Sequence, residues 1–543
     1  MVFIRQFGGA ATVVLALAAG AYPAEGPEYV GYGGPDGSRI YRDASPPLHF
    51  DMVTGEGIRW ETPLPVWGHG SPVAVRGRVF VMCEVGPKNI FPLLVCLDGA
   101  TGKVLWQREI DHLDAVTASK AEQDRLRREI RAWFDREAEL ILARARSEEE
   151  KRRAPDHDKD QNARLKALYE AMGLMHDKFR RGQYANGYSC IGDAFGTPLT
   201  DGRHVYAATP WGGFACYDFE GNRRWVAYGR GNRWTWCNIG RSPILHRGVL
   251  YSNNGGTMRA IDAASGRMLW TRDEPGKGFE PPYSMVSPAV ITTGGRDVLL
   301  AAGPSAYLLP AGTPLKVEGW VSEGMQILVK HDARDVAFFC GSGEHCGWEG
   351  KGDAAIQPPA AFRFRLQGDT LRGDLLWHGG TLGGDKGVWG GNTPWMLCVG
   401  GRFYHRGGAI LDALTGRVVG GKFTRSKWDK ARGVPQTGHF LACAGGYVFG
   451  LQDGGEKDAP AAILRVYTLG GQRVAENRLV RRPPTLEQRQ MHTYCTGNPE
   501  VWRSGQRPRF SCGHAFTFEG DRLYIRSLDA LICVGPAKGA AKP

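Results

Sequence analysis

The stretch Leu94-Val-Cys-Leu-Asp-Gly-Ala-Thr-Gly-Lys-Val-Leu-Trp106 is typical of two short β-strands joined by a tight turn. The Asp98 carboxylate can accept hydrogen bonds from the amides of this turn, and Gly102 can adopt the positive φ angle that the turn requires. Trp106 falls in the returning strand. We therefore predict a β-hairpin here, with a large aromatic side chain at a defined place in its second strand.

Copies of this hairpin recur along the chain. Residues 258–270 repeat it at the same spacing, with Asp262, Gly266 and Trp270 in the equivalent places. A looser copy runs from Asp218 to Trp225, and another over residues 410–417 lacks the tryptophan. A Ser-Pro or Thr-Pro motif precedes several hairpins and is followed by two further strand-like runs, as at residues 71–81, 197–206 and 242–251. Repeated units of four short strands predict a β-propeller, whose sheets, or blades, pack around a central axis.

Counting the units predicts an all-β, eight-bladed propeller, with a seven-bladed ring as the alternative. Blade starts are expected near Ser71, Thr197, Ser242, Ser287, Gln326, Thr393, His439 and His514. The last unit is one strand short, and the N-terminal run 57–62 has a Trp60 but no unit of its own, so we expect it to close the last blade. The blade-closing positions are Trp60, Asp98, Gly102, Trp106, Asp218, Trp225, Asp262, Gly266, Trp270 and Trp377, with further closing strands near Trp320, Val419 and Arg478. A tryptophan at this place can fill the gap between neighbouring blades, and its indole N–H can reach the next blade's backbone.

The N-terminus has the features of a secretory signal. Arg5 gives a positive start, Ala10 to Ala19 form a short apolar run, and small residues follow. We expect a signal peptide over residues 1–21, a mature protein in the periplasm or secreted, and no transmembrane segment after signal removal. The remaining organisation is expected as closing strand and blade 1 (22–110), an insertion (111–186), the other blades (187–536) and a flexible tail (537–543).

The insertion differs from the rest of the chain. Ala, Glu, Arg and Leu dominate residues 111–186, with apolar stripes of helical spacing at 126–142 and 165–175, on either side of Pro155. We predict a charged helical hairpin. It either packs on the rim of the propeller or serves as an arm that docks a partner.

Charge bears on which partners the protein can bind, and the cysteines bear on whether it forms disulfides. The formal net charge is +12, but no basic stripe with interleaved aromatic residues is present, so nucleic acid is not expected as a partner. All 12 cysteines lie beyond the signal, and in an oxidising compartment some disulfides are expected among them.

With its Asp-x-x-Thr-Gly-Lys-x-x-Trp hairpins, the chain resembles the pyrroloquinoline-quinone (PQQ)-like propeller family. That family includes quinoprotein alcohol dehydrogenases and non-enzymatic scaffolds such as BamB. The resemblance extends to the uncharacterised exported propellers whose N-terminal strand is similar to the run from Trp60 to Pro65 followed by Trp67 to Pro72. It implies a propeller over nearly the whole chain outside the signal and the insertion, and it says little about activity.

In the enzymatic branch, the resemblance implies a quinone in the central funnel, commonly under a disulfide between adjacent cysteines, with a calcium ion and a catalytic Asp. The chain has neither adjacent cysteines nor a Cys-x-x-Cys-His motif for haem attachment. Asp193, Asp385 and Asn392 could hold calcium but match no catalytic motif of the family. We therefore expect no cofactor, with PQQ and calcium as the alternative.

Residues at the start of each inner strand converge on the axis of a propeller. The candidate ligand-binding residues on this basis, with a tryptophan at the funnel mouth added, are His69, Arg241, Trp389, Asn392, His439 and His514, and Phe195 shares the position. The histidines either bind a transition metal or hydrogen-bond to backbone in a wet channel. His492, Cys495, Cys512 and His514 are a second set of metal-ligand types, whose spacing fits no standard zinc module.

The sequence thus leads to two hypotheses. The first is a non-catalytic exported propeller that binds a protein, peptide or glycan partner of the cell envelope as a scaffold. The second is a quinone- or metal-dependent oxidoreductase that acts on an alcohol or sugar in the funnel.

Overall fold

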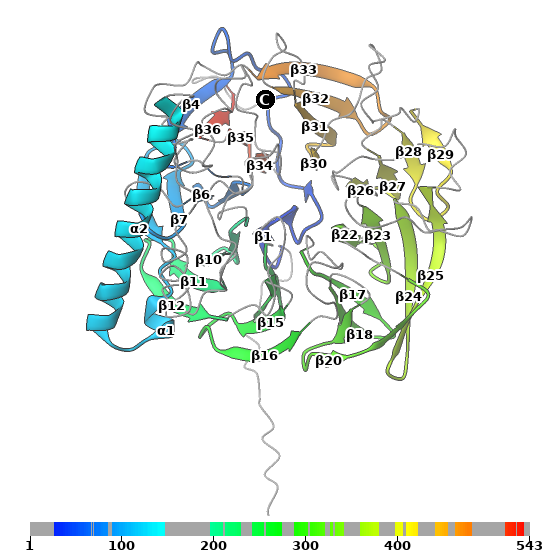
Figure 1. Cartoon of the computed structure of the whole chain (residues 1–543). Coiled ribbons are helices and arrows are strands. Elements are labelled where there is room, and N and C mark those ends of the chain that lie inside the picture. Colours follow the sequence, from blue (N-terminus) through cyan, green and yellow to red (C-terminus); the bar gives the residue numbers. More distant parts are fainter. Residues whose placement is uncertain are drawn as a thin grey trace, which may run out of the picture.

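The computed structural model describes the strands of a ring of sheets. The described residues are 27–66, 68, 70–84, 89–146, 196–209, 212–229, 242–254, 257–273, 287–301, 305–320, 326–329, 332–340, 359–379, 397–405, 409–421, 440–453, 462–479, 516–527 and 529–536. They form eight sheets arranged as blades around one axis (Figure 1). The prediction of an eight-bladed all-β propeller is confirmed, and the seven-bladed alternative is wrong.

The first four blades each contain a meander of four antiparallel strands. Blade 1 consists of β5 (Val73–Val75), β6 (Arg78–Cys83), β7 (Leu93–Asp98) and β8 (Val104–Glu109). Blade 2 consists of β9 (Leu199–Thr200), β10 (His204–Ala208), β11 (Gly213–Asp218) and β12 (Arg223–Tyr228). Blade 3 consists of β13 (Ile244–His246), β14 (Val249–Asn254), β15 (Thr257–Asp262) and β16 (Met268–Asp273). Blade 4 consists of β17 (Ala289–Thr293), β18 (Arg296–Leu300), β19 (Ala306–Leu308) and β20 (Thr313–Pro314).

The last four blades vary this plan. Blade 5 consists of β22 (Gln326–Val329), β23 (Val336–Cys340), β24 (Ala360–Gln367) and β25 (Thr370–His378), with β21 (Lys316–Glu318) added in parallel to β25. Blade 6 consists of β26 (Leu397–Val399), β27 (Arg402–Tyr404), β28 (Ile410–Asp412) and β29 (Val418–Gly420). Blade 7 consists of β30 (Phe440–Ala444), β31 (Tyr447–Asp453), β32 (Ala462–Thr468) and β33 (Arg473–Leu479). Blade 8 consists of β34 (Phe516–Glu519), β35 (Arg522–Arg526) and β36 (Ala530–Val534), and its outer strand is β4 (Ile58–Pro63).

The ring is therefore closed by the N-terminal part of the chain, as predicted: Trp60 in β4 pairs with Cys533 in β36. One detail of the prediction is corrected in blade 4. Its outer strand is β20, and the chain just before Trp320 belongs to blade 5 as β21, because Lys316 to Glu318 pair with Thr370 to Arg372.

Helices occur in the insertion. After β8 the chain forms α1 (Leu113–Val116) and then α2 (Lys120–Arg146), which lies outside the ring at the left of Figure 1. Leu126 and Ile130, from the predicted apolar stripe, are buried, which confirms the first helix of the insertion. The second predicted helix, over 165–175, lies outside the described residues.

The seams between blades share one contact. An indole N–H from the outer strand of one blade donates to a backbone carbonyl in the turn of the next, at 2.8–3.2 Å, in five seams: Trp60 to Gly99, Trp106 to Phe219, Trp225 to Ala263, Trp270 to Pro310, and Trp377 to Ala413. Each indole also lies against a glycine of that turn: Gly102, Gly221, Gly266, Gly312 and Gly416 respectively. This is the arrangement expected for the closing tryptophans.

Two seams lack a tryptophan and are filled differently. In blade 6, Gly420 takes the register position of the tryptophan, opposite Ile410, and the Ile410 side chain lies against Gly471 of blade 7. In blade 7, Ala475 takes this position, and Phe50 from the N-terminal segment is buried in the core that blades 7 and 8 share.

Candidate functional site

The two faces of the ring are built differently. On one face, short turns join the inner strand to the second and the third strand to the outer one, as at residues 76–77 and 99–103 of blade 1. The connections between blades leave the outer strands at the opposite face and enter the next inner strand there. Some are long: β25 ends at His378 and β26 begins at Leu397, and β33 ends at Leu479 and β34 begins at Phe516. Binding residues of propellers and other rigid scaffolds are carried disproportionately by such connections.

Hydroxyl groups tie the inner-strand starts of blades 1 to 3 together at that opposite face. The backbone N–H of Ser71 donates to Thr197 Oγ1 at 3.1 Å, and the N–H of Thr197 donates to Ser242 Oγ at 2.9 Å. All three side chains are buried. Arg241 directly precedes Ser242, and His69 precedes Ser71 by two residues. These bonds therefore fix the backbone next to both candidate residues.

A buried cation lies between blades 8 and 1. The Arg526 guanidinium, fully buried at the end of β35, donates to the Gly70 carbonyl at 2.7 Å and to Cys83 Sγ at 3.7 Å. A Cβ on Gly68 would lie 2.5 Å from Arg526 Nη2, so the close approach requires glycine there. Burial lowers the pKa of Arg526, and the buried Glu84 carboxylate opposes this shift. Gly68 and Gly70 flank His69, so the guanidinium holds the chain on both sides of that candidate.

The Cys83 thiol beside this guanidinium is unreactive. Burial raises its pKa to about 11, although Arg526 lowers it in part. At neutral pH the sulfur is therefore protonated and serves as a weak acceptor rather than a nucleophile.

The N-terminal segment, residues 27–57, crosses the centre of the ring (Figure 1). It contacts the short turns at Arg247 of blade 3 and Gly520 of blade 8, and so lies at their face. β1 (Val30–Gly31) pairs with β9 of blade 2 and with β2 (Gly34–Pro35), whereas β3 (Ile40–Tyr41) pairs in parallel with β30 of blade 7. The Tyr41 hydroxyl bonds to Thr517 Oγ1 at 3.2 Å, and the Ser45 N–H donates to the Gly520 carbonyl at 2.7 Å. The segment thus bridges inner strands on opposite sides of the axis.

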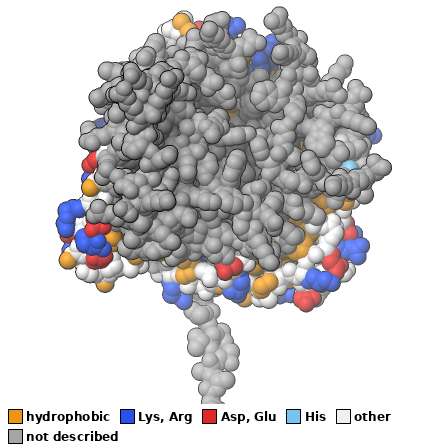
Figure 2. Space-filling model, in the orientation of Figure 1, with side chains coloured by type: hydrophobic (Ala, Val, Ile, Leu, Met, Phe, Trp, Pro, Cys, Tyr) orange, Lys and Arg blue, Asp and Glu red, His pale blue; other side chains and the backbone are white. Residues whose placement is uncertain are grey.

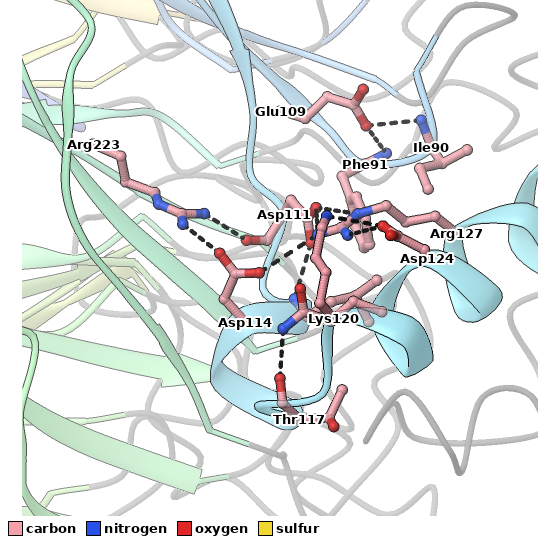
Figure 3. A network of polar contacts seen from close by, with 12 residues as sticks. Ile90, Phe91, Glu109, Asp111, Asp114, Thr117, Lys120, Asp124, Arg127 and Arg223 are labelled. Carbon is pink, nitrogen blue, oxygen red and sulfur yellow. Dashed lines mark hydrogen bonds and ion pairs between the residues drawn. The ribbon is translucent and has the colours of Figure 1, made fainter.

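A charged network fixes the base of the insertion to blades 1 and 2 (Figure 3). Arg127 of α2 donates to both Asp111 Oδ2, at 2.8 Å and 2.6 Å, and Asp124 Oδ1, at 3.2 Å. Arg223 of β12 pairs with Asp114 of α1. Figure 2 shows charged side chains at the left edge of the molecule, where α1 and α2 lie. The described start of the insertion is thus anchored to the rim.

The Glu109 carboxylate of β8 organises the chain next to this network. Its Oε2 accepts the N–H groups of Ile90 and Phe91 at 3.0 Å each. Burial raises the pKa of Glu109, and these two hydrogen bonds oppose the rise.

His112 is a buried histidine that sequence reasoning missed. Its ring stacks on Tyr228 with centroids 4.9 Å apart and meets Phe91 edge-on at 5.2 Å. Neither ring nitrogen makes a hydrogen bond of good geometry, although the Ile110 carbonyl lies near the ring. Burial lowers the pKa of His112 to about 4, so the imidazole is neutral at pH 7. A single histidine amid strand and helix ends has no spacing that sequence analysis could detect.

The candidate ligand residues all lie outside the described residues, as do the metal-ligand types: His69, Arg241, Trp389, Asn392, His439, His514, His492, Cys495 and Cys512. Their roles stay predictions. Each of them falls in the sequence between two blades, and the described strands that flank these stretches end and begin at one face of the ring. Within the described residues, no group of three or more His, Cys, Asp or Glu side chains could hold a metal ion.

The described cysteines form no disulfide. Cys83, Cys96, Cys216, Cys398, Cys443 and Cys533 are free and buried. Cys96, Cys216 and Cys533 pair in register with the tryptophans of their blades, Trp106, Trp225 and Trp60. For these six cysteines the expectation of disulfides is not met. In the part of the chain that the structure describes, no helix has the length and apolar character needed to span a membrane.

Comparisons with known proteins found one family model and several solved structures that are similar to this chain. Residues 175–272 match the family model described as outer membrane protein assembly factor BamB. No curated protein matches the chain. Similar solved structures include BamB from Moraxella catarrhalis, at 12% identity over 61% of this chain and 82% of that one, with a TM-score of 0.36.

Two further similar structures are a designed protein and an enzyme. The computationally designed Ika8 protein is 10% identical over 87% of this chain and 98% of that one, with a TM-score of 0.41. The quinohemoprotein alcohol dehydrogenase ADHIIG from Pseudomonas putida is 11% identical over 80% of this chain and 70% of that one, with a TM-score of 0.36. The family model matched over residues 175–272 agrees with the repeated Asp-Gly-Trp hairpins and the eight blades, and in these features the chain is similar to the PQQ-like, BamB-type β-propeller repeat family.

Proposed function

We propose that this protein is an exported, non-catalytic propeller that binds a protein, peptide or glycan partner in the cell envelope as a scaffold. The observation that carries the proposal is the difference between the two faces of the ring. The N-terminal segment crosses one face and short turns surround it, whereas the described outer strands end, and the next inner strands begin, at the other face. A rigid ring whose inter-blade connections start and end at one face suits recognition of a partner.

The quinone-dependent oxidoreductase is the alternative. The chain has no adjacent cysteines of the kind that the resemblance to the enzymatic branch implies. The residues that could hold calcium, Asp193, Asp385 and Asn392, lie outside the described residues.

Site-specific photocrosslinking in cells tests the binding face. A crosslinking residue at Asn392, in a connection between blades 5 and 6, is compared with one at Leu414, in an exposed turn at the opposite face. The proposal expects a discrete crosslinked partner from position 392 and none from position 414. A partner only at position 414, or none at either position in the compartment where the protein resides, contradicts it.

The same protein, purified from its native compartment, tests export and cofactor content. Intact-mass measurement is expected to show loss of the first 21 residues, and elemental analysis with absorbance is expected to show neither metal nor quinone. Addition of PQQ with calcium is expected to leave Tm unchanged, because a ligand raises Tm only if it binds the native state. A clear rise in Tm with both together would replace the scaffold proposal with the oxidoreductase.

A further inference from the structure

The N-terminal segment is attached to the ring by a histidine that lies between two carboxylates. His246, at the end of β13 in blade 3, has its Nδ1 3.4 Å from Glu28 Oε2 and its Nε2 2.9 Å from Asp297 Oδ2. Glu28 lies two residues before β1, and Asp297 belongs to β18 of blade 4. One imidazole therefore connects three parts of the chain that are distant in sequence.

Other charged and titratable groups surround this imidazole. Arg247 Nη2 pairs with Asp297 Oδ2 at 2.9 Å, and the Arg247 backbone N–H donates to the Glu28 carboxylate. Tyr251 of β14 lies within the field of both carboxylates and of Arg247, and burial raises the pKa of its hydroxyl far above neutrality. At physiological pH the titrating group of this cluster is thus the imidazole.

Both carboxylates favour the protonated imidazole. Burial lowers the pKa of His246, but hydrogen bonds and charge interactions with Glu28 and Asp297 outweigh it and raise the pKa above the usual 6.5. A protonated imidazole donates from both nitrogens, whereas a neutral one donates from only one. Deprotonation therefore removes the imidazole donor from one of the two carboxylates, which keeps only its contacts with Arg247 or, for Asp297, with Arg247 and Thr292.

Two other described anchors of the segment involve no group that titrates near neutral pH. On the far side of the axis, the Cys443 N–H donates to the Arg39 carbonyl at 2.9 Å, and the Tyr41 hydroxyl bonds to Thr517. These hydrogen bonds do not change between pH 5 and pH 8. A change of pH in that range acts on the end of the segment that contains Glu28.

We propose that Glu28, His246 and Asp297 form a pH-dependent clasp that holds the start of the N-terminal segment on blades 3 and 4 and releases it as the imidazole loses its proton. Because the folded-state pKa is raised, the added stability is fully present below about 6.5 and is lost as pH rises through the folded-state value. The clasp is closed in mild acid and looser in mild alkali.

Two measurements on the full chain test the clasp. Titration of ¹³C-labelled histidine by NMR, with the His246 signal assigned through H246Q, is expected to give a pKa above 6.5 that falls in E28Q and in D297N. Hydrogen exchange of the peptide spanning residues 27–36, corrected for intrinsic rates, is expected to be on the order of tenfold more protected at pH 5.5 than at pH 8 in the native protein. H246Q is expected to remove this difference.

The matched control is H204Q. His204 also faces a carboxylate, Asp201 at 3.3 Å, but within blade 2 and without contact to the segment through that pair. This variant should keep the pH-dependent protection of residues 27–36. The proposal is overturned if H246Q keeps that dependence, if His246 titrates at or below 6.5, or if E28Q leaves its pKa unchanged. If H246Q does not fold, the pKa of the imidazole in E28Q tests the proposal by itself, because E28Q removes one carboxylate and leaves His246 in place.

Discussion

The indole of Trp225 lies directly over Gly266 of the next blade: a Cβ built on Gly266 would be 2.6 Å from the ring. Gly266 also has a φ of 73°. The glycine of the hairpin motif is therefore required twice, once for its backbone conformation and once for the close approach of the tryptophan. These two requirements can be separated by substitution.

Gly266→Ala is expected to destabilise the fold by about 3 kcal/mol, because the strain of a positive φ adds to the clash with the indole. Gly202→Ala is the matched control. Gly202 has a φ of 83°, but nothing lies within 4 Å of an added Cβ, so only the conformational cost of about 1 kcal/mol applies there. Denaturant unfolding of both variants measures the difference. An equal loss of unfolding free energy in both variants would show that the indole of Trp225 moves aside at no energetic cost.

The indole hydrogen bonds across the seams can be tested by Trp→Phe substitutions. The Trp225 N–H donates to Ala263 at 2.9 Å, whereas the buried Trp320 N–H has no hydrogen-bond partner. Both substitutions remove the same volume, but only Trp225→Phe leaves a carbonyl without its donor. We expect Trp225→Phe to cost about 1 kcal/mol more than Trp320→Phe. Thermal unfolding compares the two, and a larger loss in Trp320→Phe would contradict the assignment.

Asn477 holds the N-terminal segment in the seam between blades 7 and 8. Its Oδ1 accepts the Phe50 N–H at 2.9 Å, and its Nδ2 donates to the Leu48 carbonyl at 2.9 Å. Asn477→Ala is expected to cost about 2 kcal/mol and to speed hydrogen exchange of residues 46–52, because two backbone groups lose their partners. Gln472→Ala, at an exposed turn of blade 7, is the control and is expected to stay within about 0.5 kcal/mol. Unchanged exchange at 46–52 would mean that Phe50 alone retains the segment.

The sequence predicted the ring because its hairpin chemistry is local and repeated. Asp98, Gly102 and Trp106 act within one turn and one seam, so their spacing shows in any copy of the motif. The outer strand of blade 4 was misplaced because it depends on pairing between distant residues, Lys316 with Thr370, which leaves no local signal. The crossing of the axis by residues 27–45 was not predicted for a similar reason. Their positive φ angles at Gly33, Gly34, Asp36, Gly37 and Arg39 produce turns without any periodic pattern.

The repeat predicts where the inner strands of the blades converge, but not which ligand the residues there bind. Convergence of inner-strand starts follows from the repeat, and the bonds from Ser71 to Thr197 and from Thr197 to Ser242 show how that convergence is held. What His439 or His514 would bind depends on side-chain positions that spacing does not determine. Arg526 and His112 have no motif at all, and their importance comes from burial, which only the folded chain reveals.

His112 predicts a loss of stability in acid. Its folded-state pKa is lowered to about 4 from the usual 6.5, so the unfolded chain binds the proton more readily between these values. The stability that this group contributes is therefore fully present above about pH 6.5 and is lost as pH falls toward 4. Between pH 7 and pH 4.5 the loss is about 2 kcal/mol. His112→Phe keeps the aromatic contacts with Tyr228 and Phe91 but cannot be protonated, so its stability should fall less over this range by that amount. His204→Phe, at a site with 36% side-chain exposure, controls for the loss of a histidine and should keep the native pH dependence. Urea unfolding at both pH values measures the three proteins, and parallel losses in the native protein and His112→Phe would show that the imidazole is protonated without unfolding.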